Sequence, residues 1–120
     1  MSRDESALLD MLAAARLIVD FRGSLTREQF ERDSRTRSAV LHQLLVLGEA
    51  AKRVSVGTRS AYPQVPWQFA AGMRDRLIHG YDDVDDDQVW ATVSADIPTL
   101  IADLEAITKG GDEGPPPAAP

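Results

Sequence analysis

The sequence predicts an all-α protein, an antiparallel bundle of four to five helices. Apolar residues recur at spacings of three and four along several stretches, and no segment shows the two-residue alternation of a strand. The 120 residues, 43% hydrophobic and 27% charged, suit one domain with one core. We expect this domain over residues 1–109, followed by a flexible tail over residues 110–120, whose Gly- and Pro-rich composition cannot bury an apolar surface.

Two helices are expected in the first third of the chain. From Ser6 to about Arg22 one apolar stripe is present, made by Leu8, Met11, Leu12, Ala15, Ile18 and Val19. Gly23 and Ser24 interrupt it. The pattern Thr26-x-x-Gln29 is that of a capping box, which predicts a short second helix carrying Phe30.

A longer central helix is expected from about Asp33 to Val54. It has a wide apolar face, and Gly48 within that face would allow another helix to approach closely. Residues 55–65 lose this periodicity and contain Gly57 and Pro63, so we expect a connecting loop there.

The last two helices follow this loop. Pro66 suits the first turn of a helix that continues to about His79, where Gly80 would supply a left-handed terminus. An Asp-rich turn precedes a final helix from about Asp86, in which Pro98 should cause a local bend.

Charge and composition exclude several kinds of protein. The net charge of −6 argues against binding a polyanion over the whole surface, so any nucleic-acid site must be local. Without cysteine there are no disulfides or thiolate metal sites, and a cytoplasmic location is the default expectation. No apolar stretch is long enough for a signal peptide or a membrane span, so we expect no membrane role.

The most informative residues are Arg74, His79 and Tyr81, around the expected end of a helix. A histidine exchanges protons near neutral pH, a guanidinium holds phosphate oxygens in a fork, and a tyrosine stacks on a base or offers its hydroxyl. RNA cleavage without a metal needs these roles. Residues five apart do not share a helix face, so Arg74 and His79 can meet only if the helix ends near His79, or they face their copies across a two-fold axis.

Simpler interpretations stand beside this one. A terminal histidine followed by glycine is often only a favourable cap and dipole contact. A metal site of His79 with Asp82 and Asp83 is less favoured, because aspartates in a turn before a helix often serve as N-caps, and we expect neither metal nor cofactor. His42 is expected to be an ordinary packed or exposed helix residue.

Two charged stretches also allow two interpretations. Five arginines lie between residues 22 and 37, and five aspartates between residues 82 and 87. Arg35 and Arg37, with Arg76 further along, could contact RNA. Alternatively, the arginine-rich stretch forms a solvated face or salt bridges to the acidic turn.

At this point the chain resembles the HEPN superfamily, and within it the HepT-like toxins. The resemblance covers about residues 5–108 and centres on the motif Arg74-x4-His79-x-Tyr81, with the polar Asp75 after the arginine. Further matching segments are Gly48-Glu49-Ala50-Ala51-Lys52, Pro63-x-x-Pro66-Trp67, Gly72-Met73-Arg74 and Val84-Asp85…Val89-Trp90. The combination is more specific than the short motif alone.

This resemblance implies a HEPN-type bundle that forms a homodimer with two Arg-x4-His motifs in one cleft, acting as a metal-independent endoribonuclease. His79 would be the general acid/base, Arg74 would stabilise the charged phosphorane, and Asp75 would orient the motif. A 2′,3′-cyclic phosphate product is expected. The chain would be the toxin of a type VII toxin–antitoxin system.

The resemblance also implies a partner and an off switch. The antitoxin would be a minimal nucleotidyltransferase that transfers AMP onto Tyr81, placing negative charge and bulk beside His79 and Arg74. The alternative is a non-catalytic HEPN subunit that docks a nucleotidyltransferase and helps it bind its substrate. The acidic balance of the chain favours this alternative slightly.

Overall fold

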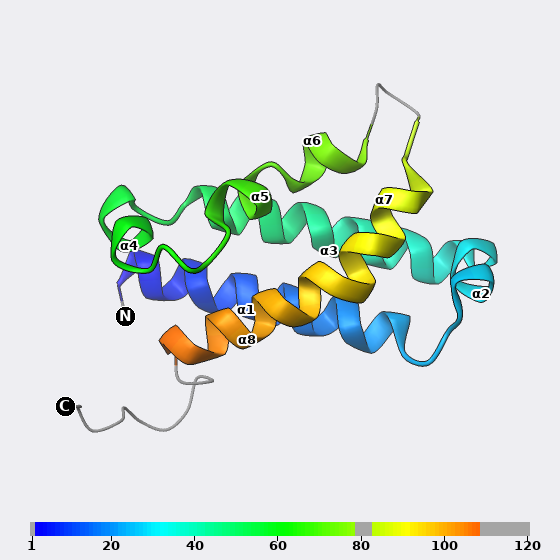
Figure 1. The fold of residues 1–120 in the computed structure, drawn as a ribbon, viewed down its shortest axis with the longest axis horizontal. Helices are drawn as coiled ribbons and strands as arrows, with labels where there is room; N and C mark the ends of the chain where they lie inside the picture. Colours follow the sequence, from blue (N-terminus) through cyan, green and yellow to red (C-terminus); the bar gives the residue numbers. More distant parts are fainter. Residues whose placement is uncertain (1, 79–82, 109–120) are drawn as a thin grey trace.

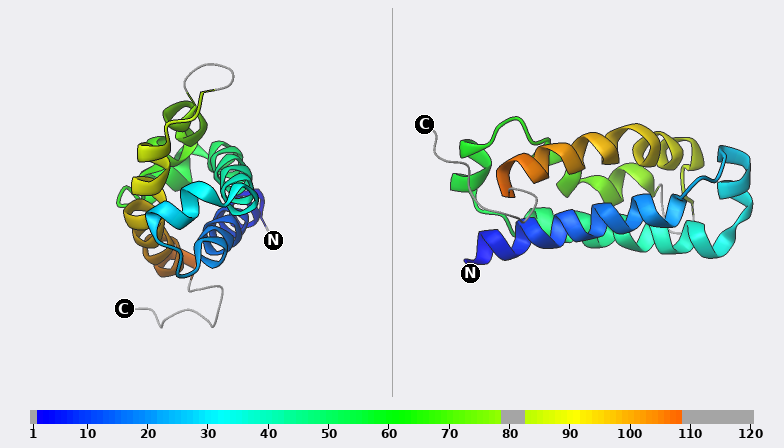
Figure 2. Two further views of the ribbon diagram at one scale, coloured as in Figure 1. Left: turned by 90° about the vertical axis from the view of Figure 1, so that its right-hand side faces the viewer. Right: turned by 90° about the horizontal axis from the view of Figure 1, so that it is seen from below.

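The computed structural model describes residues 2–78 and 83–108, and within these residues the fold is an antiparallel helical bundle (Figure 1). α1 (Arg3–Arg22) runs opposite to both α3 (Ser34–Lys52) and α8 (Ile97–Thr108), and it packs against both (Figure 2). The shorter helices are α2 (Arg27–Arg32), α4 (Val56–Ala61), α5 (Trp67–Ala71), α6 (Met73–Leu77) and α7 (Asp86–Ala91). The predicted all-α class is confirmed. The expected tail, 110–120, lies outside the described residues.

The first three helices begin at residues whose side chains cap them. Ser2 and Glu5 form a capping box, so α1 starts before Ser6, where the apolar stripe begins. The predicted capping box of Thr26 and Gln29 is confirmed at the start of α2. Asp33 caps α3 by accepting a hydrogen bond from the backbone N–H of Thr36, with an N···O distance of 3.1 Å.

The core is built mainly from one face each of α1, α3 and α8. The predicted stripe of α1 is buried except for Val19, and the large buried side chains of the same core include Phe30, Leu44, Leu47, Leu100 and Leu104. Burial of this apolar surface is the main force that holds the three long helices together.

The expected loop over residues 55–65 contains a short helix, α4, which is a correction to the prediction. Ser55 caps it by accepting from the N–H of Thr58 at 3.2 Å. Asp4, at the start of α1, accepts from the Ser55 N–H at 3.0 Å and from the hydroxyls of Ser55 and Thr58. Because α4 has no buried residue, it leaves no apolar periodicity in the sequence.

The expected single helix after Pro66 is divided into α5 and α6 at Gly72, a second correction. Pro66 lies at the N-cap of α5. The close approach predicted at Gly48 is confirmed: a Cβ atom there would lie 3.2 Å from the carbonyl oxygen of Ala70 in α5. α5 therefore lies directly on the α3 backbone, which fixes the start of α6.

α6 ends at Leu77, three residues before the glycine expected to end it. Ile78 is extended, with φ −116° and ψ 119°, and forms an isolated antiparallel bridge with Val84. The N–H of Asp85 donates to the carbonyl of Leu77 at 2.9 Å. The two sides of the segment that contains residues 79–82 are thus joined to each other.

The final helical stretch is α7, a π-helical turn over Thr92–Asp96, and α8. The π turn directly precedes Pro98, which cannot donate a backbone hydrogen bond, and the N–H of Ile97 instead reaches the carbonyl of Thr92. The local bend expected at Pro98 stays a prediction, and the irregular hydrogen bonding lies in the turn before it. No described helix is both long and apolar enough to cross a membrane.

Candidate functional site

Arg74 lies on the exposed face of α6, whose opposite face buries Met73 and Leu77 in the core. Within the described part of the chain, the Arg74 guanidinium has no salt bridge. A guanidinium is thus exposed on this surface of α6, and the phosphate contact expected for Arg74 stays a prediction.

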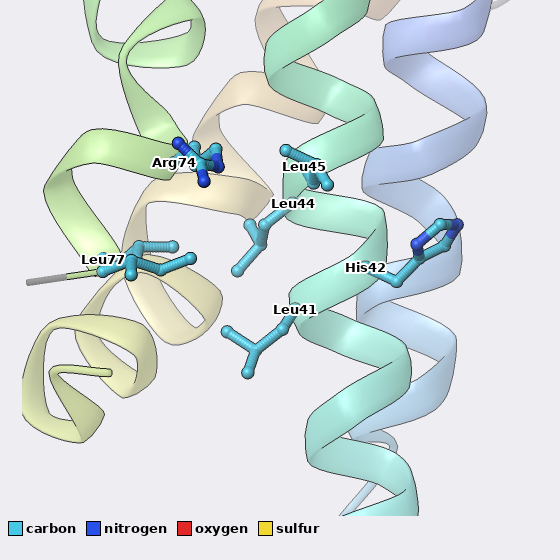
Figure 3. Close-up of a pocket in the computed structure, with 7 residues that line it drawn as sticks. Leu41, His42, Leu44, Leu45, Arg74 and Leu77 are labelled. Atoms are coloured by element: carbon cyan, nitrogen blue, oxygen red, sulfur yellow. The ribbon is translucent and has the colours of Figure 1, made fainter. Parts of the chain in front are cut away.

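Arg74 borders a pocket of about 200 Å³ between α6 and α3, whose other lining residues are Leu41, His42, Leu44, Leu45, Leu77 and Ile78. Figure 3 shows Arg74 on the α6 side and three leucines on the α3 side, with His42 directed away from the leucines. Except for Arg74 and His42 the lining side chains are apolar, so the pocket can hold a flat apolar surface beside a cation. His42 is an exposed residue of α3, as expected.

His79 and Tyr81 lie outside the described residues, as do Gly80 and Asp82. The neighbouring residues are described: α6 ends at Leu77, and the Ile78–Val84 bridge joins the chain on either side of the segment. The helix therefore ends before His79, which is the condition that the sequence analysis set for Arg74 and His79 to meet.

The other two polar residues of α6 differ in their surroundings. Asp75 is exposed. Arg76 is also exposed, but its guanidinium carbon lies 4.6 Å from the ring centre of Phe69, a cation–π contact. Its guanidinium thus lies against α5, and the RNA contact expected for Arg76 stays a prediction.

Much of the arginine-rich stretch contacts α7. Arg37 donates from Nη2 to Asp86 at 2.7 Å, and Arg27 pairs with Asp87. The guanidinium of Arg22 lies 4.8 Å from the ring centre of Trp90. The interpretation of salt bridges to the acidic turn is thus supported for Arg27 and Arg37. Arg35 is exposed, with no salt bridge among the described residues.

The acidic turn serves α7 as a cap. Asp85 accepts from the N–H of Gln88 at 3.0 Å and so forms the N-cap, the use of a turn aspartate that the sequence analysis preferred to metal binding. No group of three or more His, Cys, Asp or Glu among the described residues could hold a metal ion. The set of His79, Asp82 and Asp83 is not tested, since two of its members lie outside these residues.

The described residues form an antiparallel helical bundle with Arg74 exposed on α6, and comparison with known proteins identifies the family. Residues 11–107 match the model of the family described as Ribonuclease HepT-like. The chain therefore belongs to this family.

Two relatives show how far the likeness extends. A protein of Thermococcus cleftensis named "Probable ribonuclease HepT" is 38% identical over 102 residues, covering 85% of this chain and 93% of the relative. A Methanocaldococcus jannaschii protein named "Putative RNase" is 38% identical over 109 residues, covering 88% and 90%. No solved structure matches the chain significantly.

The sequence analysis did not identify the wall of the pocket. Leu41 and Leu45 are four residues apart on α3 and line the pocket beside α6, and the sequence analysis expected only a wide apolar face on this helix. The pocket wall could have been predicted from the apolar face of α3, because this face is wider than one neighbouring helix can cover.

Proposed function

We propose that this chain is the toxin of a type VII toxin–antitoxin pair and a metal-independent endoribonuclease, with Arg74 and His79 as its catalytic residues. Membership of the HepT-like family supports the activity class. The single structural observation that carries the proposal is the exposed guanidinium of Arg74, which has no salt bridge to any described residue and lies at the edge of an apolar pocket, one turn before Ile78. Asp75 would orient the motif.

The chemistry requires no group from outside the chain. The ribose 2′-oxygen attacks phosphorus as its proton passes to an imidazole, and the 5′-oxygen leaves with a proton from an imidazolium. The products are a 2′,3′-cyclic phosphate and a 5′-hydroxyl. The guanidinium of Arg74 would stabilise the additional negative charge on the phosphorane oxygens.

Cleavage of a defined RNA in EDTA tests this mechanism. We expect His79→Ala and Arg74→Ala each to lower kcat at least ~10²-fold, and the wild-type products to carry cyclic phosphate ends. Arg16→Ala is a matched control, because it removes an exposed arginine whose partner, Glu105, is also on the surface. Equal RNA decay by all variants, or no cleavage by the wild type, would contradict the proposal.

We also propose that Tyr81 accepts AMP from a cognate nucleotidyltransferase, which would be the antitoxin. The tyrosine oxygen attacks the α-phosphorus of ATP and pyrophosphate leaves. The added phosphate would repel RNA from the same cleft.

The chain provides a control for this reaction, because its other tyrosine, Tyr62, is exposed at the C-cap of α4. Intact mass spectrometry after incubation with ATP and the partner should show added AMP in wild type and in Tyr62→Phe. Tyr81→Phe should remain unmodified. Modification of Tyr81→Phe would place the acceptor elsewhere.

A homodimer is part of the proposal, and an apolar surface supports it. Leu17, Phe21 and Leu45 are 38%, 38% and 37% exposed. Leu17 and Phe21 share one exposed face of α1 with Asp10, which is a different face from the buried apolar stripe. Asp10 pairs with Arg53 of α3 at 2.6 Å. Both therefore lie at the outer α1–α3 junction, and Leu45 joins that surface to the pocket beside Arg74.

The second candidate function is the non-catalytic subunit that docks a nucleotidyltransferase. The observation that favours it is the use of Arg27 and Arg37 in ion pairs, which removes positive charge from the approach to Arg74 in a chain of net charge −6. Stimulation of the partner by an RNA-inactive chain would support this candidate.

Arg35 remains a proposed RNA contact. If its charge meets a phosphate, Arg35→Ala should weaken RNA affinity and flatten its dependence on salt, with the slope changing by about one unit. Unchanged salt dependence would remove Arg35 from the interface.

A further inference from the structure

The start of α7 is attached to α3 by one two-donor ion pair. Arg37 donates from Nε and from Nη2 to the same carboxylate oxygen of Asp86, at 2.9 Å and 2.7 Å. The Arg37 side chain is only 27% exposed. Two donors fix the position of this oxygen more closely than a single donor would.

Other contacts hold the same end of α7. Arg27 of α2 pairs with Asp87, whose side chain is 85% exposed. Trp90, one turn further along, lies 5.5 Å from the ring of Phe30, measured between centroids. Arg37–Asp86 is the more buried of the two ion pairs, so it has the larger part in setting where α7 begins.

Only a few residues connect the start of α7 to the end of α6, and hydrogen bonds join the two. Asp86 directly follows Asp85, whose N–H donates to the carbonyl of Leu77, and Val84 forms the bridge with Ile78. The same α6 carries Arg74. A shift of α7 would therefore move the bridge that joins the chain on both sides of residues 79–82.

We infer that Arg37 is a positioning residue for the nuclease site proposed above: through Asp86 it holds α7, and with it the Ile78–Val84 bridge, in register with α6. The inference rests on the proposed function. It replaces the RNA contact expected for Arg37, because donors committed to a carboxylate are not available to a phosphate. Rate loss from a small displacement of reacting groups is large, of order 10²-fold for about 1 Å.

The test compares Arg37→Ala, Asp86→Ala and the exchanged pair Arg37→Asp with Asp86→Arg. On a short RNA, each single change should lower kcat roughly tenfold with little change in KM, and the exchanged pair should recover most of the loss. Arg37→Lys keeps the charge but not the fork, so it should also lose rate. The control is Arg16→Ala, which breaks an ion pair of the same length between α1 and α8, 2.7 Å, and should keep the wild-type kcat.

The opposite pattern would overturn the inference. If Arg37 contacts RNA, Arg37→Ala raises KM and flattens the salt dependence, Asp86→Ala leaves kcat intact, and the exchange recovers nothing. If the wild type cuts RNA and the variants are equally active, the positioning role of Arg37 is overturned but the proposed nuclease is not. If the wild type cuts no RNA, the proposed nuclease activity is contradicted.

Amide hydrogen exchange provides a readout independent of activity. The Asp85 N–H, bonded to Leu77, should exchange faster in Arg37→Ala and Asp86→Ala than in wild type or in Arg16→Ala. Circular dichroism checks that the variants stay folded. Unchanged protection of Asp85 would overturn the inference even if the chain cuts no RNA.

Discussion

At the scale of single residues, Asp4 shows how one side chain outside the core can join two helices. Hydrogen bonds from the Ser55 hydroxyl, then from the Thr58 hydroxyl and the Ser55 N–H, hold the pKa of Asp4 below its ordinary value of 3.8. Each bond favours the charged carboxylate, and together they attach the start of α1 to the start of α4.

This lowered pKa predicts a pH-dependent contribution to stability. Between the folded pKa and 3.8 the unfolded chain binds more protons, so the free energy of unfolding contributed by Asp4 rises with pH through that window. The contribution is complete above 3.8 and is lost as the pH falls through the folded value. Urea unfolding should therefore show Asp4→Asn less stable than wild type near neutral pH, with the difference shrinking in acid. A difference that stays constant in acid would contradict this assignment.

At the scale of elements, the contact of α3 with α5 depends on the absence of one side chain. A Cβ on Gly48 would lie 3.2 Å from the Ala70 carbonyl oxygen, 3.7 Å from that of Ala71 and 3.8 Å from the Met73 Cβ. Since α6 follows α5 with only Gly72 between them, the position of Arg74 depends on this contact.

Gly48→Ala should therefore destabilise the fold by about 1–2 kcal/mol, although alanine favours a helix by ~1 kcal/mol. Gly57→Ala is the matched control, because its Cβ would meet only the Ser55 Oγ, at 3.9 Å, and it should be neutral or stabilising. Thermal unfolding of both variants measures the contrast. Equal stabilisation by both would show that α5 moves away from α3 at little cost.

At the scale of the whole molecule, the apolar surface of Leu17, Phe21 and Leu45 predicts association of two copies. Burial of such side chains between copies would stabilise a dimer by about 25 cal/mol per Å² of apolar area before the costs of association. Leu17→Glu and Phe21→Glu should each shift sedimentation toward monomer without loss of helix content.

Val56→Glu is the control for this prediction. Val56 is the most exposed of the large hydrophobic side chains, at 77%, but it lies on α4, away from Leu17, Phe21 and Leu45. It should leave the association unchanged. If Val56→Glu separates the two copies and Phe21→Glu does not, the copies associate through α4 instead.

The long helices and their starts could be predicted from the sequence because the signals are local. The stripe from Leu8 to Ile18 and the capping box of Thr26 and Gln29 depend on residues three or four apart, and both are found as expected. The chemistry expected of Arg74 likewise follows from its residue type, and the structure adds that Arg74 is exposed. The placement of His79 and Tyr81 stays a prediction.

Contacts between residues distant in sequence decided the rest. α4 depends on Asp4, more than fifty residues away. The role of Arg37 depends on Asp86, which no local pattern connects to it. By itself, the sequence determined the long helices and the family, since these signals depend on residue type and near spacing. Only the tertiary structure determined which of the described arginines pair with carboxylates, because pairing depends on how the helices pack.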